Sequence, residues 1–528
     1  MNVIKYHKRH SFYIMKVPRD ILDLERPSGT VVVYRKNGMY PVKKRGYVYD
    51  NDGKRHVVDG DIVGYFVNGK FVPSNGIMPA GSTGRIDSKE WGNIAMCDRV
   101  FKDILPELTK FYSIGDAVWL YCMCVIRTCY PDVKDYQIQR RYRESFLSEM
   151  YRNVPLSKNS ICMKLQNIGM ESNRIRNFMR SRVGSIQIDE EVIIDGSLQQ
   201  CESDVNTLSQ VSRKTYKTGT RQYLMMYAYG SERHEPICSK VYAGNMTDGR
   251  AVSDFIRSFG IERGTIVADK GFRIGTIEAA LDNLDGVHYI IPLHRDELAI
   301  TEYGLYDYDS HLKGTSVSCK KTEIPGKGRW LYSFRDLEIA ADEEKLYLEH
   351  HEDGYDPEEF AQRKREFGTI IFQSDRNMDC AKVYSMYDDR WLIELMFRTY
   401  KVDLDLNDTR VHSDYSVVAT NFVNFLSVLL TSRLIRAFDA VEDLETSPYG
   451  YTMDMLRCKR KSRVDGEEWE NERYTEKDSE LLSKLGLIDK PIIILEPKKK
   501  AGRPKGSKDK KPRKKRSKST SESATTGQ

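Results

Sequence analysis

The sequence predicts an α/β protein whose centre is built on one sheet. Two short runs of apolar and β-branched residues, EEVIIDGS and GTIVADKGF, have the composition of buried strands, and each stops at an aspartate followed closely by a glycine. Around them, segments of strand and helix periodicity follow in the order strand, strand, strand, helix, strand, helix, strand. This is the order of elements in an RNase H-like domain, which is therefore the fold that we expect.

Residues 1–90 are predicted to form a β-rich module. Three Asn-Gly or Asp-Gly pairs, at 37–38, 52–53 and 68–69, stand between aromatic or β-branched runs, which is the strongest short signal for a β-hairpin. Basic and aromatic residues alternate in VVVYRKNGMYPVKKRGYVY. That pattern slightly favours contact with a nucleic-acid backbone, although the edges of ordinary sheets carry lysines as well.

Residues 91–185 have helical periodicity. The stretch PLSKNSICMKLQNIGMESNRIRNFMRSR contains a polar cap, a short helix, an Ile-Gly break and a second, basic helix. This outline fits a helix-turn-helix, but it is more common in plain helical bundles, which we therefore favour. In the DNA-binding interpretation, the contacts are the four arginines of the second helix, Arg174, Arg176, Arg180 and Arg182.

Residues 186–295 are expected to form the first part of the RNase H-like core. The first strand is predicted at Glu191–Asp195, and two more strands at RQYLMMYAYG and PICSKVYAG. A helix in DGRAVSDFIRSFG is followed by a strand at Thr265–Asp269, a short helix and a strand at DGVHYIIPL. This order puts Asp195 at the end of the first strand and Asp269 at the end of the fourth, where a sheet opens and active sites collect.

Residues 296–380 form a segment longer than a single connecting element requires. We therefore predict an insertion here, and its composition indicates that it is mainly β. GTSVSCKKTEI and GRWLYSFRDLEI have strand composition, while residues 342–367 are charged and helical. Residues 381–440 then hold two helices, YDDRWLIELMFRTYK and the long apolar VHSDYSVVATNFVNFLSVLLTSRLIRAF. Residues 441–497 are charged and weakly patterned.

The helix predicted at 387–401 has an uneven distribution of charge. Helical geometry places five side chains in one narrow stripe, namely Tyr387, Arg390, Glu394, Arg398 and Lys401. The other residues are mostly apolar, so we expect a helix that is buried almost all round. Buried charges need partners, which are either each other, in an internal ladder, or a bound ligand.

Three acids and the residues around them resemble a known family. Asp195, Asp269 and Glu394 resemble the acidic triad of the DDE transposases of bacterial insertion sequences. The branch that they resemble has its last acid in a Y-x2-R-x3-E-x6-K signature, which is matched here by Tyr387, Arg390, Glu394 and Lys401. The stretches AGNMTD and ADKGF also resemble that branch, and the likeness extends over residues 188–437.

The resemblance implies a cut-and-paste DNA transposase. The triad would bind two Mg²⁺ ions, with Mn²⁺ as a substitute, for cleavage at the terminal inverted repeats and joining of the 3′ ends to target DNA. It also implies a hairpin at the freed end, DNA contacts from Tyr387, Arg390 and Lys401, and a homodimer on double-stranded DNA. Trp330 in the insertion would stack on a flipped base, although a tryptophan in a strand belongs more often to the core.

Two other functions compete with this one. The first is a domesticated, non-catalytic DNA-binding protein derived from a transposase, which the intact triad and signature disfavour. The second is a phosphotransferase with a nucleophilic aspartate on its first strand. Such an enzyme usually has a second acid two residues further on, where this chain has Ser197. A DNA transposase is therefore the function that we favour.

The net charge of +6 is unevenly distributed. Residues 498–528 hold 13 basic and 2 acidic residues, so the rest of the chain has a net charge of −5. This tail is predicted to be disordered when free. Its Gly-Arg-Pro centred on Arg503 resembles an AT-hook, which binds a narrow minor groove. The alternative is a nonspecific polybasic arm, and either kind of tail would bind DNA.

Cysteine usage favours a cytosol that keeps thiols reduced, and the resemblance to transposases of bacterial insertion sequences implies a cytoplasmic, nucleoid-associated protein of a bacterium or archaeon. The ten cysteines contain no CxxC pair, which argues against a zinc site or a disulfide framework. The basic N-terminus lacks the apolar core of a signal peptide. No run of about twenty apolar residues predicts a membrane span, so no membrane partner is expected.

Overall fold

The computed structural model describes residues 17–489 except 34–39, 50–54, 68, 74–85, 202, 213–214, 269–273, 282–285, 296, 352–353, 407, 410 and 465–467. The chain divides into two compact units, one of residues 1–88 with 462–470 and one of residues 89–461 with 471–528. The predicted α/β core belongs to the second unit.

The first unit contains a four-stranded sheet in the order β1-β2-β3-β4. A short helix, α1 (Arg19–Leu22), precedes the strands β1 (Thr30–Val32), β2 (Tyr40–Tyr49), β3 (Arg55–Val67) and β4 (Lys70–Pro73). All neighbouring strands pair antiparallel, with Tyr49 opposite Arg55 and Val67 opposite Lys70. This pairing confirms the hairpins that the Asn-Gly and Asp-Gly pairs predict.

Residues 92–183 form the helical part of the second unit, as their periodicity predicts. The helices are α2 (Gly92–Phe101), α3 (Ile104–Thr109), α4 (Ile114–Cys129), α5 (Asp135–Glu144), α6 (Leu147–Met150), α7 (Lys158–Met170) and α8 (Ser172–Val183).

The helix pair α7–α8 lacks the geometry of a helix-turn-helix. Glu171 alone separates the two helices, whereas a helix-turn-helix has a turn of about three or four residues. The DNA-binding alternative also required Arg182 as a contact, and the structure does not favour that role. Its side chain is only 9% exposed, and its Nη2 donates to Glu235 Oε1 at 3.0 Å. The plain bundle is therefore the better interpretation, and Arg182 is a structural residue.

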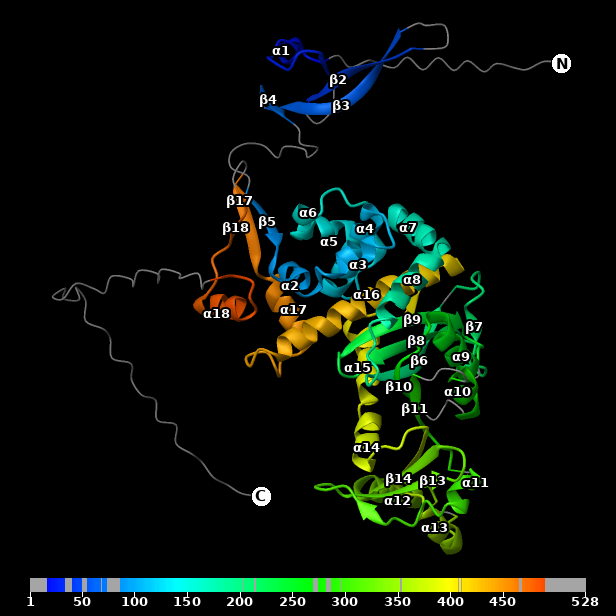
Figure 1. Cartoon of the computed structure of the whole chain (residues 1–528). Helices are drawn as coiled ribbons and strands as arrows, with labels where there is room; N and C mark the ends of the chain where they lie inside the picture. Colours follow the sequence, from blue (N-terminus) through cyan, green and yellow to red (C-terminus); the bar gives the residue numbers. More distant parts are fainter. Residues whose placement is uncertain are drawn as a thin grey trace, which may run out of the picture. The chain divides into compact units, whose positions relative to one another are not determined.

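The centre of the second unit is an 11-stranded sheet (Figure 1). Five of its strands follow the predicted order and lie side by side as β9-β8-β6-β10-β11. They are β6 (Glu191–Cys201), β8 (Arg221–Gly230), β9 (Glu235–Ala243), β10 (Gly264–Ala268) and β11 (Val287–Pro292). β10 runs parallel to β6 and β11, while β8 runs antiparallel to β6 and β9. The helices α9 (Asp248–Phe259) and α10 (Ile274–Leu281) lie where they are predicted, and the short strands β7 (Gln210–Val211) and β16 (Asp408–Thr409) pair with β8 and β6.

The first core strand is longer than predicted. It does not end at Asp195 but continues to Cys201, because Asp195 pairs with Tyr227 and Gly196 pairs with Met226 of β8. Cross-strand hydrogen bonding thus overrides the turn preference of the Asp-Gly pair. Asp195 lies within the strand, and the prediction of a strand end at this residue is wrong.

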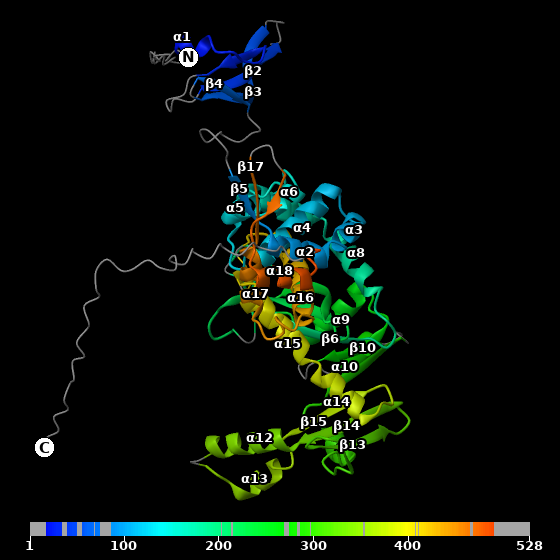
Figure 2. The ribbon, with the colours of Figure 1, turned by 90° about the vertical axis from the view of Figure 1, so that its left-hand side faces the viewer.

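The insertion continues the same sheet. β15 (Thr369–Ser374) pairs antiparallel with β11, and β12 (Ser310–His311), β13 (Val317–Ile324) and β14 (Arg329–Asp336) extend the sheet beyond it. The prediction of a mainly β insertion is wrong, because the helices α11 (Leu298–Glu302), α12 (Leu337–His350) and α13 (Pro357–Arg363) contribute about as many residues as the strands. Figure 2 shows α12 and α13 side by side at one end of the insertion.

The long helix α16 (Asp414–Asp439) is the central core helix of the second unit. It contacts α2, α4, α7, α8 and β9 (Figure 1). Its approach to α7 is so close that a Cβ on Gly169 would lie 1.8 Å from the Tyr415 carbonyl oxygen. By length and composition alone α16 could cross a membrane, but 78% of its most apolar window is buried within the protein. The helix thus has the burial expected of a core helix.

Beyond α16, the described residues up to 489 form two helices and two short strands. These are α17 (Tyr449–Arg457), β17 (Arg460–Val464), β18 (Glu470–Asn471) and α18 (Glu476–Lys484). With β5 (Ile86–Glu90), the two strands form a small sheet in the order β18-β17-β5.

Candidate active site

Asp195 lies on the sheet face that the predicted signature helix covers. Residues directly opposite each other on paired strands present their side chains on the same face, and Tyr227 is opposite Asp195. The Tyr227 ring contacts the Phe397 ring of α15 (Trp391–Arg398) edge-on, with 5.8 Å between ring centroids. The half-buried Asp195 carboxylate therefore belongs to the layer between β6 and α15, where its Oδ1 accepts a hydrogen bond from the Gly196 N–H at 2.7 Å.

Asp269 follows the strand beside Asp195 but lies outside the residues that the structure describes, as does Arg503. The last described residue of β10 is Ala268, which is aligned with Ile194 of β6 in parallel register. The two strands that lead to the first two predicted acids are therefore neighbours. Sequence order alone separates these acids by 73 residues, and the sheet register brings their strands together.

The signature stretch is not one continuous α-helix. It consists of α14 (Cys380–Asp388), α15 and a π-helical turn, η1 (Thr399–Asp403). At the junction of α14 and α15 the N–H groups of Arg390, Leu392 and Ile393 donate to carbonyls three residues back, so the turn is tighter than an α-helix. The prediction of burial almost all round is also wrong, because Trp391 is 52% and Leu395 39% exposed.

Three of the four signature side chains form a chain of contacts. The Tyr387 ring packs against the Phe372 ring of β15, with centroids 4.4 Å apart. The Arg390 guanidinium lies 5.6 Å from the centroid of the Tyr387 ring, and its Nη2 donates to Glu394 Oε1 at 2.6 Å. The ion pair of the predicted internal ladder is therefore present between Arg390 and Glu394. Since the Glu394 side chain is 55% exposed, this carboxylate also faces solvent.

These three side chains line a groove of about 930 Å³ between the insertion and the signature helices. The end of β11 and the following turn, β14, the start of α12, β15, α14 and α15 contribute its wall. Its charged and aromatic residues are His294, Arg295, Phe334, Asp336, Glu343, Tyr384, Tyr387, Asp388, Arg390, Trp391 and Glu394. The groove thus offers aromatic faces, which suit the bases of a nucleic acid, and four carboxylates against two guanidinium groups, each of which is paired with one of them. The excess of carboxylates beside Glu394 suits a bound cation.

Lys401 lies in the π-helical turn and outside the wall of this groove. The wider turn places Thr399 and Tyr400 in the core, where the Tyr400 hydroxyl accepts a hydrogen bond from Asn424 Nδ2 at 2.8 Å. Lys401 is half-buried and is not among the residues that line the groove. The structure therefore brings Tyr387, Arg390 and Glu394 together, and it does not bring Lys401 to the same wall.

Trp330 lies on β14, in the insertion, and is half-buried. It pairs with Glu323 and Ser374 on the neighbouring strands, and Lys321 Nζ lies 4.8 Å from the centroid of its ring. Part of the ring packs against the main core. Both interpretations of Trp330, as a core residue and as a base-stacking residue, are compatible with this position.

A buried acid that the sequence did not single out lies on the same face as Asp195. Glu191 begins β6, is 3% exposed, and has an Oε1 atom that no described hydrogen-bond donor reaches. Its neighbour in the register, Thr265, is 1% exposed, and its Oγ1 also lacks a described partner. Burial, followed by the Asp389 carboxylate, raises the pKa of Glu191 to about 8. The even spacing of Glu191, Ile193 and Asp195 along the strand could have shown that Glu191 shares their face, but the sequence does not show that its Oε1 is left without a partner among the described residues.

Glu191→Gln should remove a specific pH dependence of stability. Because the folded pKa of Glu191 is about 8 and the unfolded value is near 4.3, the group stabilises the fold fully below pH 4.3 and loses this contribution as pH rises to 8. Glutamine mimics the protonated form. The variant should therefore gain stability over the wild type by about 1.4 kcal/mol per pH unit between pH 5 and 8. Urea titrations across this range measure the free energy of unfolding of the variant and of the wild type. A difference that does not change with pH would contradict the raised pKa of Glu191.

The acids of the candidate site fit a hard divalent cation by their chemistry. Within the described residues no three His, Cys, Asp or Glu side chains gather closely enough to hold a metal ion. Asp269 is not one of those residues, so only two members of the predicted triad are described. Both of these, Asp195 and Glu394, offer carboxylate oxygens, which Mg²⁺ and Mn²⁺ prefer to nitrogen or sulfur.

Comparison with known proteins adds a family match. Residues 187–430 match the family described as Transposase DDE domain, a segment of less than half the chain that contains Asp195, Asp269 and Glu394. This match supports a DDE transposase. A solved structure similar to this chain is the cryo-EM structure of a piggyBac transposase synaptic complex with hairpin DNA. It is 10% identical, the alignment covers 69% of this chain and 79% of that chain, and the TM-score is 0.39. No curated protein matches the sequence.

Proposed function

We propose that this protein is a cut-and-paste DNA transposase. It cleaves the terminal inverted repeats of its own mobile element and joins the 3′ ends to target DNA, through a hairpin at the freed end. The observation that carries the proposal is the match of residues 187–430 to the transposase DDE domain, because this segment contains both Asp195 and the Glu394 signature. The packing of α15 on β6, the strand of Asp195, supports the pairing of these two acids in one site.

The fold of the catalytic part is proposed to be RNase H-like. The sheet order β9-β8-β6-β10-β11, in which β8 runs antiparallel to the other four strands, supports this assignment. The insertion between the second and third acids extends the same sheet through β15. The site would therefore lie where the core strands, the insertion and the signature helices meet.

Asp195, Asp269 and Glu394 are proposed to hold two Mg²⁺ ions. Bound there, the ions would supply activation of the attacking oxygen and stabilisation of the leaving oxygen in an in-line displacement at phosphorus. Glu394 would exchange its hydrogen bond with Arg390 for the metal site, which its 55% exposure allows. Asp195 would be held in place by the paired backbone of β6 and β8.

The other signature residues are proposed to hold the DNA end. Arg390, freed from Glu394, is suited to a terminal phosphate because a guanidinium binds phosphate oxygens in pairs. Tyr387 is fixed by its contact with Phe372 and would orient that guanidinium. Lys401 is proposed as a contact to DNA further from the groove, and Arg503 in the tail as a minor-groove contact.

The substrate is double-stranded DNA, which a homodimer is proposed to bind in the bacterial or archaeal cytoplasm. The alternative remains a domesticated protein that binds DNA without cleaving it. The test uses the full-length protein and duplex DNA that carries one end of the repeats flanking its gene. Nicking and joining in Mg²⁺ or Mn²⁺, but not in EDTA, are the expected results. Specific binding of the end without cleavage in either metal would instead favour the domesticated protein.

Trp330→Ala tests the role of the insertion in the hairpin step. If the indole stacks on a flipped base, the variant should nick normally but form hairpins more slowly by about 5- to 150-fold, since such stacking contributes roughly 1–3 kcal/mol. Single-turnover gels separate the two products. A core role predicts a lower melting temperature and an equal loss of both steps, because truncating a packed tryptophan destabilises the fold.

A further inference from the structure

The insertion has a strongly acidic part that the proposed function does not use. Residues 337–366, here called the acidic arm, comprise α12, α13 and their connection, and they hold 11 acidic and 4 basic residues. The net charge of the arm is therefore −7. The whole chain has a net charge of +6. Residues 498–528 contribute +11 and the arm contributes −7, so all other residues together contribute only +2. The net acidity of residues 1–497 thus arises from the acidic arm.

The basic residues of the arm already have acidic partners. Lys364 Nζ lies 2.9 Å from Glu344 Oε1, and Lys345 Nζ lies 3.9 Å from Glu349 Oε1. Arg363 pairs with Glu359, and Arg365 pairs with Asp307, which lies outside the arm. The carboxylates that remain in excess repel one another and repel DNA. They are therefore suited to a cationic partner.

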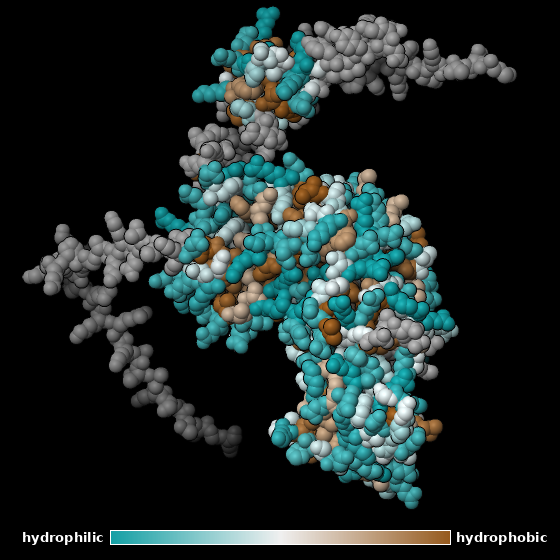
Figure 3. All heavy atoms as spheres, in the orientation of Figure 1, coloured by the Kyte–Doolittle hydropathy of each residue, from teal (hydrophilic) through white to brown (hydrophobic). Residues whose placement is uncertain are grey.

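The helix α12 also presents apolar side chains that the described part of the chain leaves exposed. It is 14 residues long, and Ala340 is the residue of it that is buried. Leu337, Leu346 and Leu348 are 52%, 52% and 41% exposed. Figure 3 shows hydrophilic side chains over most of the visible surface of the insertion, with apolar ones scattered among them. A soluble helix normally buries such side chains, so this face has the composition of a docking surface.

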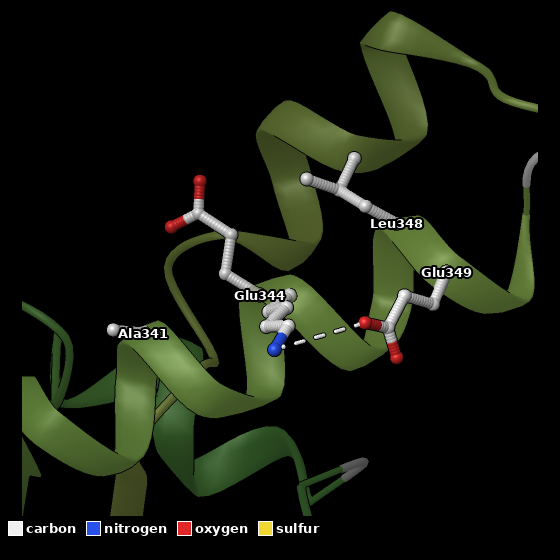
Figure 4. A pocket seen from close by; sticks show the side chains of 5 residues that line it. Ala341, Glu344, Leu348 and Glu349 are labelled. Atoms are coloured by element: carbon white, nitrogen blue, oxygen red, sulfur yellow. Dashed lines mark ion pairs between the residues drawn. The ribbon is translucent and has the colours of Figure 1, made fainter. Parts of the chain in front are cut away.

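A hollow of about 580 Å³ on α12 combines these two features (Figure 4). Ala341 and Leu348 provide apolar surface, and Lys345 lines the hollow with them. The carboxylates beside it are Glu344 and Glu349, which are paired with Lys364 and Lys345 but whose side chains are still 30% and 55% exposed. Figure 4 shows Glu344 and Leu348 extending to the same side of the helix, with the Lys345–Glu349 ion pair next to them. Lysine and arginine side chains fit this arrangement, because their aliphatic stems pack on apolar groups while their charged ends meet carboxylates.

We propose that the basic tail of the same chain, residues 498–528, docks on the acidic arm. The tail has a charge of +11 against −7 for the arm, and its cations are lysines and arginines spaced by small residues and prolines. The contact neutralises charge on both sides and covers the exposed leucines with lysine and arginine stems. It also keeps the tail from DNA until DNA competes for it, a consequence that rests on the proposed function.

The first experiment detects the contact without DNA. Full-length protein at low ionic strength is treated with a carbodiimide, which joins lysine amines to neighbouring carboxylates without a spacer. Mass spectrometry then identifies the linked residues. Links from the lysines of 498–518 should concentrate on the arm, with Asp342, Glu344 and Glu349 among the acceptors. The yield should not change on dilution and should fall as salt rises.

Two charge-matched variants make the result specific. The arm variant carries Asp342→Asn, Glu344→Gln and Glu349→Gln. The control variant neutralises three exposed acids elsewhere, by Glu442→Gln, Glu445→Gln and Glu480→Gln. Both variants gain three units of charge. Total tail cross-linking should fall at least 5-fold in the arm variant and stay within 2-fold of the wild type in the control. Melting curves of both variants show that the fold is intact.

The second experiment measures the effect on DNA. At low salt the arm variant should bind a random-sequence duplex about 3- to 10-fold more tightly than the control variant, and the difference should vanish at high salt. Tail links spread evenly over acids of the whole chain, or equal affinities of the two variants, would overturn the proposal. A yield that falls on dilution would assign the tail to a second copy and overturn the intramolecular contact. If the protein binds no DNA at all, the proposed function fails, while the cross-linking result still decides the docking.

Discussion

Glu394→Gln is expected to abolish metal-dependent DNA cleavage while leaving the protein folded. The substitution keeps the size of the side chain and removes the charge that the proposed Mg²⁺ site requires. The rate of nicking should fall on the order of 10³-fold or more, which is the scale of losing one preorganised electrostatic group in an active site. Single-turnover cleavage of an end duplex in Mg²⁺, with end binding measured in parallel, gives the comparison.

The stability of this variant separates a metal ligand from a structural ion pair. The Glu394 side chain is 55% exposed and the Arg390 side chain 20% exposed, so their ion pair contributes little to the fold. We expect the free energy of unfolding to change by less than about 1 kcal/mol. If Arg390, Glu394 and Arg398 formed a buried ladder of ion pairs, the substitution would lower the free energy of unfolding by several kcal/mol. Glu394 and Arg398 are both exposed, so we do not expect a loss of that size.

Lys401→Ala is the matched control on the same stretch of chain. It removes a charge from the π-helical turn, outside the groove that Glu394 lines. This variant should retain nicking within about 10-fold and lose affinity for the cut end, with a shallower dependence of binding on salt. A Glu394→Gln protein that cleaves at the wild-type rate would exclude the proposed mechanism, whatever Lys401→Ala does.

The sequence predicted the order of the core elements because each has a clear periodicity. The apolar runs of β6, β8 and β10 and the amphipathic pattern of α9 are local properties, and the structure confirms these elements. The extension of β6 through Asp195 to Cys201 is different. It depends on pairing with β8 along the whole strand, and the Asp-Gly pair locally indicates a turn. Local sequence preference therefore predicted the existence of β6 but not the residue at which it ends.

The arrangement of the predicted site residues was predictable only in part. The spacing of Tyr387, Arg390 and Glu394 put them on one face, and they do line one groove. The spacing of Lys401 from Glu394 also fits an α-helical face, but the chain changes to a π-helical turn at Thr399. The buried contact of Tyr400 with Asn424 accompanies that change, and it joins residues 24 positions apart. Such a contact has no signal in local sequence.

Ion pairs between residues that are far apart in the sequence are also hard to predict from local patterns. Arg182 reads as a DNA contact on a basic helix, yet its guanidinium donates to Glu235 at the start of β9. Arg433 and Arg436 of α16 bind the same carboxylate. Three arginines from two helices thus meet one glutamate, and each is an ordinary surface residue in its own local sequence.

Glu235→Ala is expected to cause the largest loss of stability among the substitutions considered. Glu235 Oε1 lies 3.0 Å from Arg182 Nη2, and its Oε2 lies 3.0 Å from both Arg433 Nε and Arg436 Nη2. The Glu235 and Arg182 side chains are each 9% exposed and that of Arg433 is 15% exposed, so alanine leaves two nearly buried guanidinium groups without this carboxylate. Removing one partner of a buried ion pair costs about 3–5 kcal/mol.

The pH dependence and a control variant test the origin of this loss. Burial raises the pKa of Glu235, but Arg433 and Arg182 outweigh it and lower the pKa below its usual value. A lowered pKa stabilises the fold above the unfolded value near 4.3, and the contribution is lost as pH falls through the folded pKa. Urea unfolding should therefore show that Glu235→Ala has a lower free energy of unfolding than the wild type, with the full difference at pH 7 and a smaller one in acid.

The control variant is Arg436→Ala, which removes a 41% exposed partner of Glu235. It should cost less than about 1 kcal/mol. Equal small losses in both variants would contradict this account. They would mean that backbone carbonyls and Asp103 are sufficient partners for Arg182 and Arg433, and that Glu235 does not hold the helices to the sheet.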